Sequence, residues 1–172
     1  MTGVRTLLRA GLGSLAVLGG VLAAEPAAPA ATLVSEGRTV LVLGFDVLAS
    51  FPYALPDISA AGTESPAAPA QKIPDEIRAF SGRLVAVSGY MMPLQLENGR
   101  ARQFVLVRNL ASCCYGVAPN LNEYLLVTMK GEGVRPMMDV PITVAGTLKV
   151  GETFEEGLLV GIYQLDGEKL MP

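Results

Sequence analysis

The chain has 172 residues, and its 13 basic and 16 acidic side chains give a formal net charge of −3. This balance disfavours a nucleic-acid partner, because phosphate binding depends on clustered lysine and arginine. The sequence contains no histidine. It therefore lacks the commonest general base and the commonest metal ligand, and it cannot form a histidine-dependent catalytic triad. Its carboxylates are scattered as well, so we expect a protein that is not an enzyme.

Residues 1–24 have the pattern of a secretory signal peptide. Arg5 and Arg9 precede an uncharged run, 10–24, that ends in two alanines. Its 15 residues fall short of the roughly 20 that a membrane-spanning helix needs. The sequence therefore predicts an exported protein of the bacterial periplasm or cell envelope. The alternative is an uncleaved leader, which would be the protein's only contact with a membrane.

Two Ala/Pro-rich stretches, 25–38 and 57–71, are expected to be spacers. Between them lies an apolar island at 39–56, with the sequence TVLVLGFDVLASFPYALP. We interpret this island as an extended arm that packs on the main domain, since Pro52 and Pro56 exclude a helix around them. A short local hairpin or a disordered segment is the alternative.

Residues 72–172 have the patterns of a small β domain. Pro74 with the acidic residues after it, up to Gly82, predicts one or two turns of helix. β-branched and alternating runs then predict short strands, and turn dipeptides separate them. The expected strands are 83–90, 101–108, 124–129, 142–148, 158–164 and 168–171, with hairpin turns at Asn98-Gly99 and Asp166-Gly167.

Glycines inside two of these strands bear on the architecture. Gly89 and Gly146 stand where the sharply bent strands of a small barrel would need a residue without a side chain. The expected fold is therefore all-β, a closed or partly open OB-like barrel of five to six strands with one short helix. A β-sandwich is the alternative, because periodicity does not reveal how a sheet closes.

Both cysteines lie in one connection, which we call the cysteine loop, between the strand-like runs 104–107 and 124–127. They are adjacent, as Cys113 and Cys114. A structural disulfide is disfavoured, because a trans peptide holds neighbouring Cα atoms about 3.8 Å apart and a bridge would be strained and redox-active. Three interpretations stay open: one buried and one exposed thiol, a soft-metal site, or a redox or intermolecular disulfide.

The methionines extend the metal hypothesis. The pairs at 91–92 and 137–138 are expected at strand ends, near the mouth of the barrel, and Asp139 follows the second pair. Thiolate and thioether ligands without histidine favour Cu(I) over zinc. Methionine pairs in small barrels are, however, more often core filling. The candidate metal ligands are Cys113, Cys114, Met138 and Asp139.

Four segments, 73–94, 104–109, 113–127 and 141–168, resemble an uncharacterised family of exported bacterial proteins, domain of unknown function family 3299. The most specific element is CCYGVAPNLN, a Cys-Cys-aromatic-Gly-x-x-Pro-x-x-Asn run. The resemblance implies export and a β-barrel-like fold. The candidate partner-binding residues of this run are Tyr115, Gly116, Pro119 and Asn122.

The resemblance also implies a function, through two features of other family members. Many of them have a Cys-x-His arrangement, and the genes of some lie beside ABC-transporter genes in metal-handling loci. In this chain Tyr115 or Gly116 stands where a ligand histidine would be. We expect an exported, non-catalytic accessory or binding protein with the cysteine loop as its site and an envelope transporter or another exported protein as its partner. The alternative is a thiol-redox protein that uses the vicinal cysteine pair.

Overall fold

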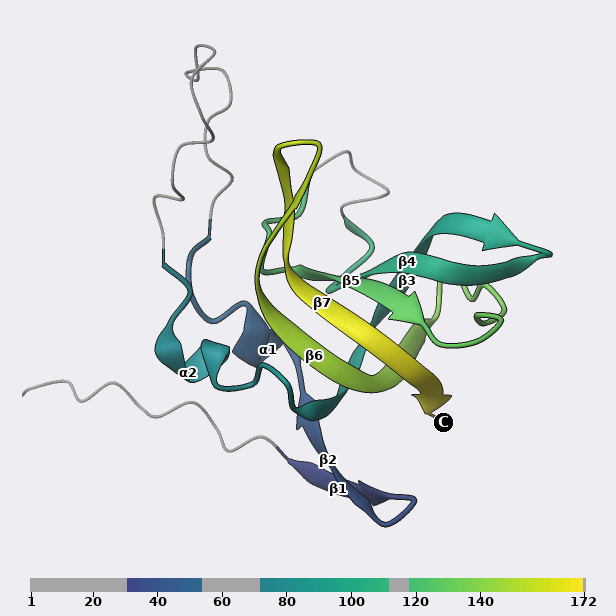
Figure 1. Cartoon of the computed structure of the whole chain (residues 1–172), viewed down its shortest axis with the longest axis horizontal. Coiled ribbons are helices and arrows are strands. Elements are labelled where there is room, and N and C mark those ends of the chain that lie inside the picture. The colour runs from purple at the N-terminus through teal and green to yellow at the C-terminus, as the bar shows by residue number, and fades with distance from the viewer. Residues whose placement is uncertain (1–30, 54–71, 112–117, 172) are drawn as a thin grey trace, which may run out of the picture.

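The computed structural model describes residues 31–53, 72–111 and 118–171. These residues form a mostly β structure with two very short helices (Figure 1). The elements, in chain order, are β1 (Thr32–Ser35), β2 (Arg38–Leu43), α1 (Phe45–Leu48), α2 (Asp75–Arg78), β3 (Leu84–Glu97), β4 (Arg100–Val107), β5 (Tyr124–Met129), β6 (Pro141–Glu155) and β7 (Leu158–Met171).

The described strands form one mixed sheet in the order β1-β2-β3-β4-β5-β7-β6. A further pairing of β3 with β6 closes the last five strands into a ring. β2 pairs with β3, and β5 with β7, in parallel, and the other pairs are antiparallel. The ring is not a regular barrel. It confirms the prediction of an OB-like, closed or partly open barrel of five to six strands, and it differs from the two packed sheets of a sandwich.

Two hairpins project from the ring, β3–β4 and β6–β7. The sequence predicted the turn of only the first one correctly. Asn98 and Gly99, with φ of 51° and 73°, join β3 to β4 as expected. The predicted turn at Asp166-Gly167 is wrong, because β7 runs unbroken through both residues. The turn lies earlier, at Glu156 and Gly157, whose φ values are 50° and 82°.

Close packing explains why Gly167 is not a turn residue. A Cβ atom there would lie 2.4 Å from the Met129 sulfur of the neighbouring strand. Its register partner in β6 is Gly146, where a Cβ atom would lie 2.4 Å from the Asp166 carbonyl oxygen. The ladder also shifts register between Ala145 and Gly146. Both glycines therefore let β6 and β7 bend closely against each other and against β5.

The described part of the predicted arm, 39–53, which we call the arm, packs on the ring. Residues 41–43 of β2 pair with residues 85–87 of β3. Leu48 is fully buried in the same apolar core as the ring residues. Its carbonyl accepts a hydrogen bond of 2.8 Å from the buried Tyr163 hydroxyl. The arm was expected to be extended, but it contains the short helix α1. This helix ends four residues before Pro52, so the proline does not disturb its hydrogen bonds.

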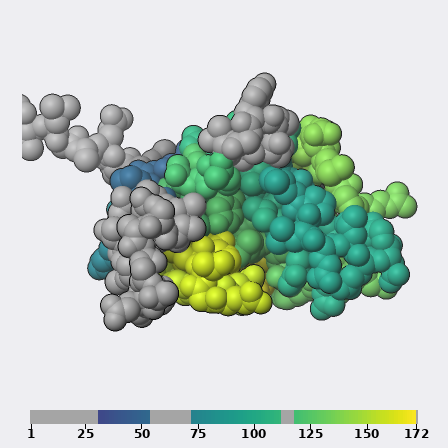
Figure 2. Space-filling model, turned by 90° about the horizontal axis from the view of Figure 1, so that it is seen from above, coloured from purple at the N-terminus to yellow at the C-terminus, as the bar shows by residue number. Residues whose placement is uncertain are grey.

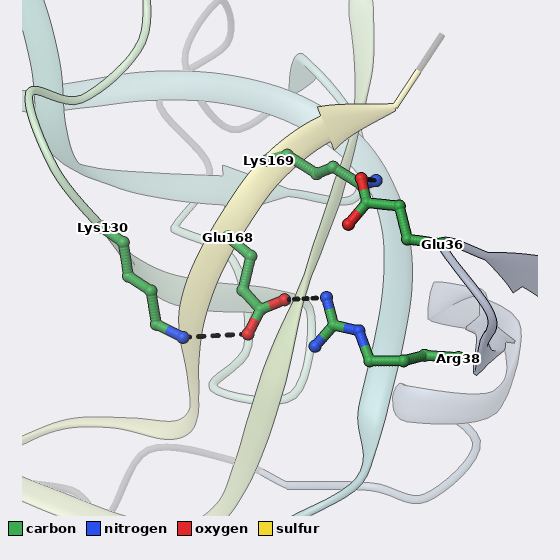
Figure 3. Close-up of polar contacts among 5 residues, drawn as sticks. All are labelled: Glu36, Arg38, Lys130, Glu168 and Lys169. Carbon is green, nitrogen blue, oxygen red and sulfur yellow. Dashed lines mark hydrogen bonds and ion pairs between the residues drawn. The ribbon is translucent and has the colours of Figure 1, made fainter.

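β1 and its turn lie within the range 25–38 that composition assigned to a spacer, and charged side chains connect them to β7 (Figure 3). Arg38 donates to Glu168 at 2.7 Å, and Lys130 donates to the other oxygen of Glu168 at 2.9 Å. Lys169 contacts Glu36. Hydrogen bonds from Arg38 and then Lys130 lower the pKa of Glu168 to about 2. We call these five residues the charge cluster.

The leader, 1–24, and the second expected spacer, 57–71, lie outside the described residues. In the part that the structure describes, no helix is both long enough and apolar enough to cross a membrane.

Candidate functional site

Of the residues predicted to form the site, Cys113, Cys114, Tyr115 and Gly116 lie outside the described part of the chain. Pro119 and Asn122 are described, and so are the residues on both sides of the gap. The geometry of the site can therefore be built from the two stems that carry the cysteine loop.

The stems leave the sheet side by side, because Val107 of β4 and Tyr124 of β5 are antiparallel partners. The next pair outward continues the ladder, since the Arg108 backbone N–H donates to the Glu123 carbonyl at 3.0 Å. The Arg108 guanidinium also lies 3.6 Å from a Glu123 carboxylate oxygen. Beyond it, the Asn109 side-chain oxygen accepts a hydrogen bond of 3.0 Å from the Ala111 backbone N–H. These hydrogen bonds hold the first stem from Arg108 to Ala111.

Glu123 organises the second stem as well. One of its carboxylate oxygens accepts hydrogen bonds from the backbone and the side-chain amide of Asn120, at 3.1 and 3.2 Å. Its backbone N–H in turn donates to the Asn120 carbonyl at 2.9 Å. These bonds fix a tight turn directly before β5. Glu123 was not predicted as a site residue, and it is fully engaged in holding the two stems.

Asn122, a predicted partner-binding residue, contacts the arm. Its side chain is only 3% exposed, and its amide donates to the Phe51 carbonyl of the arm. A buried amide that is bonded to another segment is a structural link rather than a free contact for a partner. The pair is 71 residues apart in sequence, so local pattern gave no signal for it.

The arm and the second stem line an open pocket of about 240 Å³, which we call the first cavity. The Phe51 and Tyr53 rings stand edge to face, with centroids 6.1 Å apart. The Tyr53 hydroxyl donates to Glu152 at 3.0 Å, and burial, followed by this bond, raises the pKa of Tyr53 above its ordinary value. The lining residues are Ala49, Ser50, Phe51, Pro52, Tyr53, Asn120, Asn122 and Glu123.

The other candidate ligands are far from the stems. Met138 is exposed on the β5–β6 connection, which is tied to the start of β4 by the bridge between Ala101 and Val134. The cysteine loop leaves β4 at its other end, and the eight residues of β4 span about 25 Å. Met138 and Asp139 therefore do not join the described stems. Met91, expected at a strand end, is buried in the interior of β3.

Among the described residues, no group of three or more acidic or cysteine side chains is arranged to hold a metal ion. The carboxylate nearest to the cysteine loop in sequence, Glu123, is paired with Arg108. A metal site at the loop would thus depend on the cysteines themselves.

Comparison with known proteins identifies the family of the chain. A family model described as a protein of unknown function, DUF3299, matches residues 57–172. The chain belongs to the DUF3299 family. A crystal structure of a DUF3299 family protein from Pseudomonas aeruginosa PAO1 is similar, with a TM-score of 0.53 and 25% sequence identity over 76% of this chain and 94% of that chain. No curated protein matches the chain.

Proposed function

We propose that this protein is an exported, non-catalytic binding protein of the bacterial envelope, and that its cysteine loop captures a soft metal ion or a partner such as an envelope transporter. The observation that carries the proposal is the anchoring of both loop stems beside a cavity. A connection whose two ends are held by a rigid sheet suits recognition, because the sheet fixes where the loop begins and ends.

The polar groups around the stems support binding rather than catalysis. A cysteine nucleophile needs a neighbouring base. Glu123, the carboxylate next to the second stem, already contacts Arg108 and Asn120. Its charge is therefore already used to hold the two stems.

A soft metal is the favoured small ligand on chemical grounds. Two thiolates on adjacent residues, in a sequence without histidine, match the preferences of Cu(I) better than those of zinc. The same thiols support the alternative function, in which Cys113 and Cys114 cycle between a dithiol and a disulfide. In that cycle the two sulfurs form one bond and release two protons and two electrons to an oxidising partner of the envelope.

The first test is the intact mass of the full chain purified from its native compartment, before and after alkylation of free thiols. Two added alkyl groups on a metal-free protein would show open thiols and support capture. A mass that is two hydrogens lower, without alkylation, would establish the vicinal bridge and support the redox alternative. A doubled mass would show a disulfide-linked dimer.

Single variants then separate the two functions. Titration of the reduced chain with Cu(I) should give stoichiometric binding that is lost in both Cys113→Ser and Cys114→Ser, while Ser112→Ala, a matched change in the same run, should bind as the wild type does. A two-electron couple that either cysteine variant abolishes, without metal binding, would favour the redox function. If neither variant changes metal binding, partner capture or redox behaviour, both functions are wrong.

A further inference from the structure

A second cavity, of about 300 Å³, lies on the outer face of the ring, away from the cysteine loop. Its floor is formed by β4, β5 and β7, and its walls include Leu94 of β3 and Glu155 at the end of β6. Phe104 and Leu165 lie beneath the floor and are buried in the core. The cavity is therefore a groove outside a packed ring, and it shares no lining residue with the first cavity.

The floor of the groove carries a row of polar side chains on neighbouring strands. Gln103 of β4 is the register partner of Thr128 of β5, which in turn faces Asp166 of β7. Gln164 lies two residues before Asp166 on the same face. Within the described residues, the side chains of Gln103, Thr128 and Gln164 make no hydrogen bond. They offer both donors and acceptors to a ligand.

An exposed leucine stands at or beside each side of the groove. Leu94, which lines the groove, is 63% exposed. Leu158 does not line it, but it is 61% exposed and stands directly opposite the lining residue Glu155 in the β6–β7 ladder, so both side chains point to the same face. Figure 2 shows the teal β3–β4 region next to the yellow β6–β7 region on one face of the molecule. The leucines can contact apolar groups of a ligand, and the polar floor can form hydrogen bonds with it.

We propose that this groove binds an extended segment of a partner polypeptide that carries apolar side chains at its ends and a basic side chain beside one of them. The apolar ends would lie on Leu94 and Leu158, and the segment's backbone would hydrogen-bond to the amides of Gln103 and Gln164. The proposed basic residue would pair with the carboxylate of Glu155. Asp166 is paired with Lys149 at 2.8 Å, whereas Glu155 has no ion pair among the described residues.

Other occupants fit the groove less well. The surplus of carboxylates repels the phosphates of a nucleic acid. A sugar would stack on an aromatic face, but the one aromatic residue of the lining, Phe104, is fully buried. Strand addition is closed as well, because β4, β5 and β7 are paired on both sides. In OB-type barrels the face of the second and third strands and the adjoining hairpins binds ligands, an analogy of fold that does not name the ligand.

The test is selection of short random peptides displayed on phage against the full chain, followed by measurement of the affinity of the enriched peptides for variants. We expect sequences with apolar residues at both ends and a basic residue beside one of them. Their affinity should fall at least about tenfold in Leu94→Glu and in Gln164→Lys. Leu33→Glu, the same change at an exposed leucine of β1, is the matched control and should leave the affinity unchanged, as should Cys114→Ser.

NMR titration of the labelled full chain gives a second measurement that does not depend on the variants folding. The enriched peptides should shift the side-chain amide signals of Gln103 and Gln164. The proposal is overturned if enriched peptides shift only Asn120 and Asn122 at the first cavity, if no groove-dependent peptide is enriched, or if chitotetraose shifts the groove amides and the peptides do not.

Discussion

The arm, 39–53, and the segment that precedes it, 32–38, are attached to the same ring by different forces; we call the preceding segment, β1 and its turn, the hairpin. In the arm, Leu48 and Tyr53 are almost completely buried, and they belong to the core of the ring. In the hairpin, Leu33 and Val34 are 45% and 78% exposed, and the charge cluster makes the connection to β7 (Figure 3). The arm is thus attached by buried contacts that exclude water, and the hairpin by ion pairs that are exposed to water.

This difference sets the expected energies. Full burial of a leucine side chain contributes about 2 kcal/mol and hardly depends on salt. An exposed ion pair contributes between about 0 and 1 kcal/mol, and salt screens it. The arm should therefore unfold only with the ring, whereas the hairpin should be the part that opens first. Each prediction below tests one side of that contrast.

The largest effect is expected from Leu48→Ala. This change removes a fully buried side chain at the junction of the arm and the ring, and it should lower the free energy of unfolding by about 3 kcal/mol. Chemical denaturation measures it. Leu33→Ala in the hairpin is the matched control, with an expected change within about 0.5 kcal/mol. Equal losses in the two variants would show that the arm is no better packed than the hairpin.

Tyr163→Phe should cost about 1–2 kcal/mol, because it leaves the buried Leu48 carbonyl without its donor. Tyr90→Phe is the control, since the Tyr90 hydroxyl makes no hydrogen bond within the described residues. A small loss in both variants would mean that this bond does not help to hold the arm.

Tyr163 also predicts a pH dependence. Burial raises the pKa of Tyr163 above its ordinary value, so the folded state favours the neutral phenol. Its contribution to stability is complete below the unfolded pKa of about 10 and is lost as the pH rises towards the folded pKa. Thermal unfolding above pH 10 should therefore become less pH-dependent in Tyr163→Phe than in the wild type. An unchanged alkaline slope would contradict this assignment.

Asn122→Ala tests whether the arm also steadies the cysteine loop. It removes the donor to the Phe51 carbonyl and should lower the free energy of unfolding by about 1 kcal/mol. Asn120→Ala, at an exposed position of the same turn, should cost less. If the order of the two losses is reversed, the turn depends on Glu123 rather than on the arm.

The same contrast shows which features sequence can predict. The Asn98-Gly99 turn was predictable because its positive φ values depend on the two residues themselves. The turn expected at Gly167 was wrong because the need for glycine there comes from the Met129 side chain of another strand. Sequence indicates where a residue without a side chain is needed, and only the fold shows whether a turn or a close contact requires it.

The candidate site divides in the same way. The motif pointed to the cysteine loop, and the described stems that carry it lie side by side at the ends of β4 and β5. The wall contributed by Phe51 and the structural role of Asn122 could not be predicted, because their contact joins residues that are 71 positions apart. The groove between the hairpins was also missed, since its polar row appears only when the register of three strands is known.

The smallest effect is expected from Glu168→Gln, which removes the acceptor for Arg38 and Lys130. The loss should be below about 1 kcal/mol and should shrink as salt is added. The pKa of Glu168, lowered to about 2, means that its contribution is present above the unfolded pKa of about 4.3 and disappears as the pH falls towards 2.

Acid unfolding between those two pH values should accordingly be shallower in Glu168→Gln than in the wild type. Glu156→Gln, at the tip of the β6–β7 hairpin, removes a carboxylate that has no ion pair among the described residues and should not alter the slope. Hydrogen exchange at Val34 completes the test. If the charge cluster alone holds the hairpin, exchange there should accelerate with salt while exchange at Leu48 does not, because only the hairpin's attachment is screened.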